Sequence, residues 1–177
     1  MLFRSYSSSN GTAELSYTEY TYNASGAAFD TDSNTLDYTT TYRSSTSRVK
    51  VSETFYDTRL GQGFEISNYS LNYKSDGSGV KNTTVFFYGS LNSRTSDKDK
   101  DGKYIVNEDT QMASSATYDG DRSTDLSTIS FDTTTARESV TYYAGGVKQE
   151  VAKYTINYDK TDGTTVKDTS EIRRAHV

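Results

Sequence analysis

Hydrophobic and polar residues alternate along several short stretches of the chain, which is the pattern of a β-strand with one buried face. In the stretch 150–158, the residues expected on the packed face are Ala152, Tyr154, Ile156 and Tyr158, and those on the other face are Lys153, Thr155 and Asn157. The stretch 65–73 alternates in the same way, with Tyr69, Leu71 and Tyr73 on the packed face. No stretch carries apolar residues at the spacing of an amphipathic helix, so the pattern predicts an all-β fold.

These two stretches are copies of one motif. Residues 65–73 read EISNYSLNY and residues 150–158 read EVAKYTINY, and each copy is followed by an Asp-Gly pair, Asp76-Gly77 and Asp162-Gly163. A motif repeated along a chain is typical of arrays in which each unit stacks on the next. Such arrays usually serve as scaffolds, spacers or binding surfaces.

The turns predict how the strands connect. Asp-Gly between two alternating runs favours a tight hairpin, because glycine adopts positive φ at little cost. Further strands are predicted on either side of the copies and earlier in the chain, at residues 17–22, 36–42, 49–56, 80–88, 111–118, 126–131, 137–143 and 165–173. The short connections predict tandem antiparallel meanders or hairpins, forming an elongated repeat sheet, a solenoid or a loose sandwich.

The repeat also divides the chain into three predicted units. These are a leading or degenerate β unit at residues 1–48, a first repeat unit at 49–110 and a second repeat unit at 111–177. The polar stretch 89–110 reads as a loop at the end of the first repeat unit.

Composition narrows the class of protein. Only 32% of the residues are hydrophobic, but 16 Tyr and 7 Phe supply large rings that suit a half-exposed sheet. The low hydrophobicity is also typical of disorder, yet disordered chains are poor in the aromatic and β-branched residues that are abundant in this sequence. The net charge of −5 has both signs interspersed, which argues against a nucleic-acid surface. No apolar run is long enough to span a bilayer.

The cellular compartment is suggested by indirect signs. There is no Cys, so disulfides and thiolate sites are excluded. Residues 1–10 lack the apolar core of a secretory signal. The chain therefore either stays inside the cell or is a piece of a longer secreted protein, and the repeat favours the second interpretation. We expect an extracellular or cell-surface location.

One stretch carries a specific chemical motif. Residues 97–108 match the calcium-loop pattern D-x-D-x-D-G-x5-E, in which Gly102 permits the sharp turn. Carboxylates, together with one backbone carbonyl at position 7, converge on Ca²⁺ in such loops. The predicted ligands are Asp97, Asp99, Asp101, Lys103 (through its carbonyl) and Glu108.

This stretch resembles the EF-hand loop over twelve residues, but its flanks do not read as helices. It is closer to the isolated DxDxDG loops found between β elements of extracellular bacterial proteins. Without an exit helix to aim Glu108, the neighbouring Asp109 is an alternative ligand. The other interpretation is a solvated loop, in which Lys98 and Lys100 partly neutralise the carboxylates. If calcium binds, the resemblance implies a structural role at about 0.1–1 mM.

No catalytic arrangement is apparent, and the sequence predicts that the protein is not an enzyme. Glu65 and Glu150 occur once per copy at the start of a strand, which is more typical of a structural residue. His176 lies in the last residues, where it is hard to orient as a base. A second acidic cluster, Asp119 to Asp121 with Asp125, reads more simply as an Asx turn between strands.

Residues 142–143, 157–158 and 162–169 resemble tandem units of very large Tyr-rich bacterial proteins, and more loosely Tyr-Asp repeats of the Rhs type. The Gly-Arg that usually follows in Rhs-type repeats is absent. The resemblance implies a fragment of a giant surface protein. We therefore expect a structural module acting as a stalk, fibre or adhesive spacer, stiffened by Ca²⁺ and contacting further copies or neighbouring subunits. The alternative is a module that binds a glycan or peptide on a Tyr-lined sheet face.

Overall fold

The computed structural model describes residues 2–9, 13–23, 34–44 and 46–171. In these residues the regular structure consists of antiparallel strands and one short 3-10 helix, so the predicted all-β fold is confirmed. The chain forms two compact units, residues 1–81 and 82–177. The division into residues 1–48, 49–110 and 111–177 follows the repeat instead and stays a prediction.

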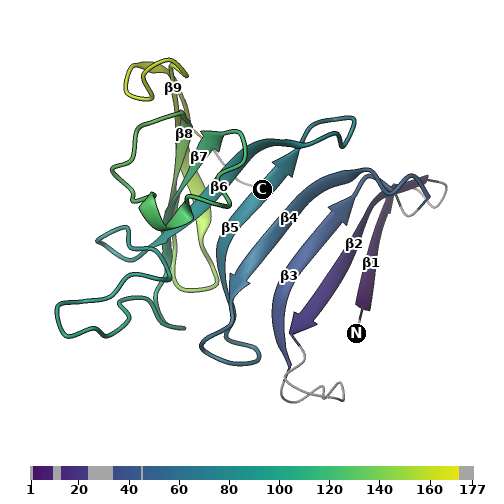
Figure 1. Ribbon diagram of the computed structural model, residues 1–177, viewed down its shortest axis with the longest axis horizontal. Coiled ribbons are helices and arrows are strands. Elements are labelled where there is room, and N and C mark those ends of the chain that lie inside the picture. Colours follow the sequence, from purple (N-terminus) through teal and green to yellow (C-terminus); the bar gives the residue numbers. More distant parts are fainter. Residues whose placement is uncertain (1, 10–12, 24–33, 45, 172–177) are drawn as a thin grey trace, which may run out of the picture. The chain divides into compact units, whose positions relative to one another are not determined.

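The first unit is an antiparallel meander in which each strand pairs with the next along the chain (Figure 1). Its strands are β1 (Leu2–Ser9), β2 (Ala13–Asn23), β3 (Thr35–Tyr42), β4 (Lys50–Asp57) and β5 (Ile66–Tyr73). Strands β2 to β5 correspond to the strands that alternation predicts before residue 74, with ends that differ by a few residues. Strand β1 was not predicted, because residues 2–9 carry no clear alternation.

The second unit is a meander of the same kind. It contains β6 (Val80–Tyr88), which begins in the last residues of the first unit, β7 (Met112–Asp119), the 3-10 helix η1 (Leu126–Thr128), β8 (Arg137–Ala144), β9 (Val151–Tyr158) and β10 (Val166–Glu171). The strand predicted at 126–131 is wrong. The Thr128 hydroxyl and N–H both bond to the carbonyl of Asp125, at 2.7 and 2.9 Å, and this local bonding favours a turn over a strand.

Strands β2–β5, called the first set, have the same irregularities as strands β6–β9, called the second set. Each pair of neighbouring strands within a set has one register shift. The shifts fall between Thr21/Tyr22, Thr41/Tyr42 and Phe55/Tyr56 in the first set, and between Phe87/Tyr88, Thr117/Tyr118 and Tyr142/Tyr143 in the second. A shift bends a strand and re-aims its side chains, so the two sets share a backbone design.

Side-chain contacts match as well. Phe55 stacks on Tyr69 with ring centres 4.6 Å apart, and Tyr142 stacks on Tyr154 at 4.7 Å. Hydroxyl pairs join neighbouring strands at corresponding positions, namely Thr18–Thr41 with Thr84–Thr117 (both 3.1 Å), and Thr54–Ser70 (2.7 Å) with Thr141–Thr155 (2.8 Å). A cation lies over a ring in both sets, Lys50 over Tyr73 and Arg137 over Tyr158. Cross-strand contacts of this kind stabilise a sheet.

The two sets differ in the core. One cross-strand row of the first set consists of Glu19, Thr40, Glu53 and Leu71, and the corresponding row of the second set consists of Val85, Ala116, Val140 and Ile156. All four residues of the first row are buried, as are Val85, Ala116 and Val140. We call these the central rows. The same backbone position therefore carries a polar core in one set and an apolar core in the other.

The carboxylates of the first central row are fully engaged. Glu19 accepts hydrogen bonds from the hydroxyls of Tyr17 (2.9 Å) and Tyr42 (3.3 Å) and forms an ion pair with Arg48 at 2.8 Å. Glu53 accepts from Thr40, Tyr73 and Lys50. Buried charges are tolerated when they are paired and hydrogen-bonded, which explains two glutamates in a core.

The opposite face of each set carries a second row of polar residues. The residues next to the central rows are Thr18, Thr41, Ser52 and Asn72 in the first set and Thr84, Thr117, Ser139 and Asn157 in the second. Successive residues of a strand point to opposite faces, so this row lies on the face opposite the central row and is polar in both sets. All eight residues are partly exposed. Each set thus has a mostly buried central row on one face and a polar, partly exposed row on the other.

Candidate functional site

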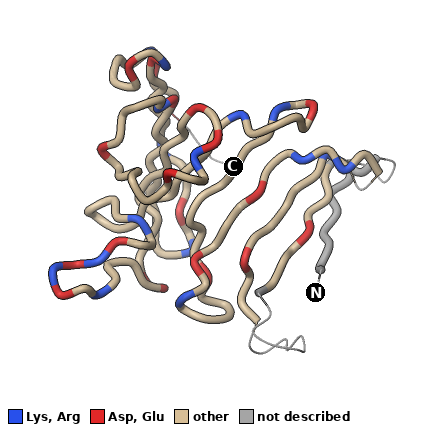
Figure 2. The backbone as a smooth tube through the Cα atoms, viewed as in Figure 1, with Lys and Arg blue, Asp and Glu red and all other residues tan. Residues whose placement is uncertain are grey.

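The predicted calcium loop lies in the connection between β6 and β7. Figure 2 shows lysines and aspartates alternating along it. Its carboxylates are exposed, and the residue that anchors the loop is Val106, which is completely buried. Val106 therefore anchors the loop, which presents its charged tip to solvent.

The tip is closed by its own backbone. One carboxylate oxygen of Asp99 accepts the N–H groups of Asp101 and Lys103, both at 2.9 Å. The carbonyl of Lys103 accepts the N–H of Asp99 at 2.8 Å, and Gly102 has a φ of +77°. Gly102 thus makes the turn that the pattern assigns to it, and Asp99, predicted as a ligand, holds this turn with its carboxylate. The carbonyl predicted as a ligand, that of Lys103, is already used within the turn.

The remaining predicted ligands are not brought together. Asp97 accepts the N–H of Arg94 at 2.8 Å, Asp101 has its side chain exposed, and Glu108 lies on an exposed turn. Among the described residues, no three acidic or histidine side chains are gathered closely enough to hold a metal ion. Coordination by all five predicted ligands requires this loop to rearrange, so the calcium site stays a prediction.

The other acidic residues singled out in the sequence have structural partners. Glu65 accepts the backbone N–H of Leu36 at 2.8 Å, and Glu150 accepts that of Met112 at 3.0 Å, so each carboxylate bonds to the backbone at the start of a strand. Asp121 accepts the N–H of Ser123 at 2.9 Å, which is the expected Asx turn. His176 lies outside the described residues.

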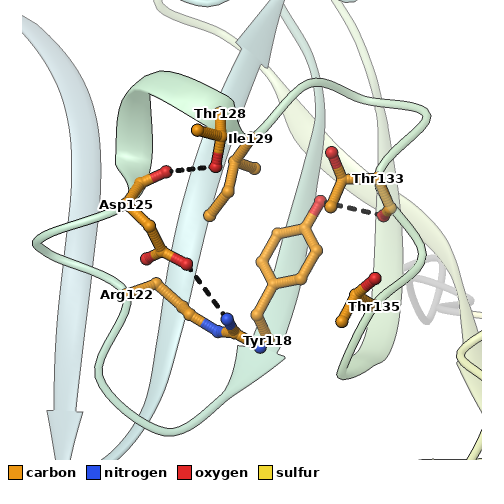
Figure 3. Close-up of a pocket in the computed structure, with 7 residues that line it drawn as sticks. All are labelled: Tyr118, Arg122, Asp125, Thr128, Ile129, Thr133 and Thr135. Carbon is orange, nitrogen blue, oxygen red and sulfur yellow. Dashed lines mark hydrogen bonds and ion pairs between the residues drawn. The ribbon is translucent and has the colours of Figure 1, made fainter.

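A pocket of about 310 Å³ lies in the second unit, under the connection between β7 and β8 (Figure 3). Its lining residues are Tyr118, Arg122, Asp125, Thr128, Ile129, Thr133 and Thr135. Figure 3 shows the ring of Tyr118 rising between Ile129 on one side and Thr133 and Thr135 on the other. The floor is therefore aromatic and aliphatic, and the rim is mainly polar.

The charges at this pocket balance. Arg122 forms an ion pair with one oxygen of Asp125 at 3.0 Å. The other oxygen, Oδ1, is buried and has no hydrogen-bond partner among the described residues. The pocket thus offers a guanidinium donor, a carboxylate acceptor and threonine hydroxyls, without a net charge from its lining.

Tyr118 is the residue of the pocket whose pKa is shifted. It is completely buried, and its hydroxyl donates to the carbonyls of Ser130 and Thr133, each at 3.4 Å. Burial raises the pKa of Tyr118 to about 12, although Arg137, Arg94 and Arg122 act in the opposite direction. The phenol is therefore neutral at physiological pH and acts as a hydrogen-bond donor.

Sequence reasoning missed this pocket, although one signal was present. The connection between β7 and β8 has 17 residues, 120–136, whereas the corresponding connection between β3 and β4 has 7, residues 43–49. Loops longer than about 12–15 residues are uncommon in compact domains and are often functional. Comparing the two connections required the strand boundaries, which the repeat motif alone does not give.

No known protein-family model matches this chain, and no curated protein matches it either. In the described part of the chain, no helix is long and apolar enough to cross a membrane.

Proposed function

We propose that the protein is a structural repeat module of an extracellular or cell-surface protein, serving as a stalk, fibre or adhesive spacer. The observation that carries this proposal is the agreement between the first and second sets in register shifts, ring stacks and hydroxyl pairs. A packing contact must recur in every unit of an array, whereas a catalytic site has no reason to. The partners of such a module are further copies or neighbouring subunits.

An extended chain tests the proposal. Lys81 and Lys167 occupy corresponding positions, so residues 1–167 can be joined to residues 82–177 to add one more set in register. An array unit should accept this insertion, because each new set offers the contacts that the previous set needs. We expect cooperative unfolding, a melting temperature no lower than that of the parent, and resistance of the new set to limited proteolysis. Selective digestion of the added set would contradict the proposal.

We also propose that Ca²⁺ stiffens the module at residues 97–108. The loop matches the full sequence pattern, and Asp99 and Gly102 already hold the required turn. The carbonyl of Lys103 already accepts the N–H of Asp99, so binding of Ca²⁺ must weaken or break that hydrogen bond. We therefore expect weak binding, near the 0.1–1 mM of extracellular modules. Such an affinity suits the proposed location outside the cell.

Thermal melts with millimolar calcium and with chelator test this site. Asp101→Ala removes one predicted ligand and leaves the turn bonds of Asp99 in place, and Asp132→Ala is the matched control at an exposed aspartate outside the loop. We expect a calcium-dependent rise in melting temperature that Asp101→Ala abolishes and Asp132→Ala retains. The absence of any shift in the parent protein would remove calcium from the proposal.

The alternative function, binding of a glycan or peptide on a Tyr-lined sheet face, has weaker support. Rings such as Phe55 and Tyr69 stack on each other across strands, which is what packing requires of them. If packing is their role, Tyr69→Leu should lower the melting temperature without changing retention on any glycan or peptide surface. A change in retention with no change in stability would favour the alternative.

A further inference from the structure

The pocket of the second unit coincides with a clear departure from the correspondence between the two sets, in the connection between β7 and β8. Tyr42 and Tyr118 are the last buried tyrosines of corresponding strands, β3 and β7. The hydroxyl of Tyr42 bonds to Glu19, and the guanidinium of Arg48 covers its ring with its centre 4.6 Å away. Above Tyr118 the longer connection, residues 120–136, replaces that cover and encloses the pocket. Insertions into one unit of a repeat array are commonly found on its binding face.

We propose that this pocket binds a neutral, hydroxyl-rich ligand of about the size of one sugar ring. Its volume of about 310 Å³ is at the lower end of the range for ligand pockets, which limits the ligand to a small molecule or a single residue of a polymer. The lining contributes one positive and one negative charge already paired with each other, so a charged ligand gains no counter-ion. This inference adds a second role; its binding argument rests on the lining of the pocket.

The polar groups of the rim match such a ligand. Oδ1 of Asp125 has no partner in the described part of the chain and is enclosed in this structure, so a rotation of the carboxylate presents this acceptor to a ligand hydroxyl. Thr128 and Thr135 are exposed at the rim, and Arg122 is partly exposed, so further hydroxyls can both donate and accept. Below them Ile129 is buried and Tyr118 is completely covered, so they shape the floor. Convergent polar groups over an apolar floor fix the orientation of a small ligand.

The first unit supplies a matched loop for the test. Replacing residues 120–136 with the sequence of residues 43–49 removes the pocket and joins the same two strand ends as in the first unit. Two point variants keep the fold intact even if this exchange does not: Asp125→Ala removes the acceptor, and Thr135→Val removes an exposed hydroxyl at constant shape. Thr46→Val, in the short connection of the first unit, is the control.

Binding is measured by saturation-transfer NMR and calorimetry with methyl glycosides of glucose, galactose, mannose and N-acetylglucosamine, together with glucuronate and glucosamine as charged probes. We expect saturable binding of at least one neutral glycoside. Its affinity should fall about tenfold in Asp125→Ala, as is usual when a hydrogen bond to a charged group is lost, and less in Thr135→Val. The control should bind like the parent, and the melting temperatures of the point variants should be unchanged.

Three results would overturn the inference: no saturable binding of any neutral probe, binding confined to the charged probes, or equal binding by the parent and by both point variants. The last result would place the ligand elsewhere, as on the Tyr-lined face. None of these results alters the outcome expected for the extended chain, so the two proposals fail independently.

Discussion

The polar central row offers the sharpest test of how this sheet is stabilised. Glu19 is replaced by Val, the residue at the corresponding position 85 of the second set. The change removes the acceptor used by the hydroxyls of Tyr17 and Tyr42 and the ion pair with Arg48. The Glu19 side chain is 10% exposed, whereas that of Arg48 is 49% exposed. Solvent therefore screens the ion pair, and the two hydroxyl bonds set the expected magnitude.

The magnitude follows from these contacts. Each lost hydrogen bond to a charged acceptor costs about 1.5–3 kcal/mol, and burial of the Val side chain returns roughly 1.5 kcal/mol. We expect Glu19→Val to lower the free energy of unfolding by about 2–4 kcal/mol. Glu19→Gln keeps the volume and an acceptor oxygen, so it should cost about 1 kcal/mol.

Urea unfolding monitored by tyrosine fluorescence and far-UV circular dichroism measures both variants. If the two units unfold separately, the loss should fall in the transition of residues 1–81. The reverse change, Val85→Glu, places a carboxylate at a completely buried site of the second set. In that set Thr83 stands in the place of Tyr17, and Val140 stands in the place of Glu53. Val85→Glu should cost at least about 3 kcal/mol. The reasoning is refuted if Glu19→Val is as stable as the parent. It is also refuted if Glu19→Gln lowers the free energy of unfolding as much as Glu19→Val does.

Three further predictions concern pH, a glycine and the repeated glutamates. The hydrogen bond from Arg48 lowers the pKa of Glu19 below its ordinary value of 4.5. Burial raises the pKa of Glu53, but the hydrogen bonds from Lys50 and Tyr73 outweigh burial, so the pKa of Glu53 is also below 4.5. The stabilisation is therefore present above about pH 4.5 and lost as the pH falls further, and urea midpoints at several pH values should show a smaller loss in Glu19→Gln. A Cβ on Gly163, at φ +64°, would clash with the carbonyl of Thr134, so Gly163→Ala should lower the melting temperature clearly more than Gly61→Ala, at φ +90° in open space. Glu65→Ala and Glu150→Ala remove equivalent bonds to backbone N–H groups, and each should cost about 1–2 kcal/mol in urea unfolding; a large effect of only one of them would contradict their equivalence.

Alkaline titration gives one more check on the pocket. Burial raises the pKa of Tyr118 to about 12, so its ionisation near pH 12 opposes folding. The raised pKa means that the stabilisation is complete below about pH 10 and is lost as the pH rises through 12. Ultraviolet absorbance of the phenolates should show a tyrosine that titrates near 12 in the parent and is missing in Tyr118→Phe.

The strands were largely predictable because alternation is a local property. Residues 65–73 and 150–158 alternate cleanly and form β5 and β9, and the stretch 36–42 lies within β3. Strand β1 could not be predicted, since its pairing with β2 depends on tertiary contact and not on its own pattern.

The candidate sites were less predictable, because a site depends on residues distant in sequence. The calcium motif is contiguous and was found, but its exposed carboxylates are shared among local turns. The pocket joins Tyr118 on a strand to Thr135 across a loop, and no motif connects them. The glutamates of the central row read as ordinary polar residues in the sequence, since only the strand register places Glu19 and Glu53 on either side of Thr40.

The contrast between the two central rows has a consequence for folding errors. Tandem units with nearly the same strands are prone to exchange them during folding, which traps misassembled chains. A strand that carries Glu53 cannot replace the strand of Val140 without burying a carboxylate among Val85, Ala116 and Ile156, away from Lys50 and Tyr73. The polar row therefore makes the strands of the first set a poor fit to the apolar core of the second set, so each strand is stable only in its own unit. A chain carrying the apolar row in both units should be the one that misassembles on rapid refolding.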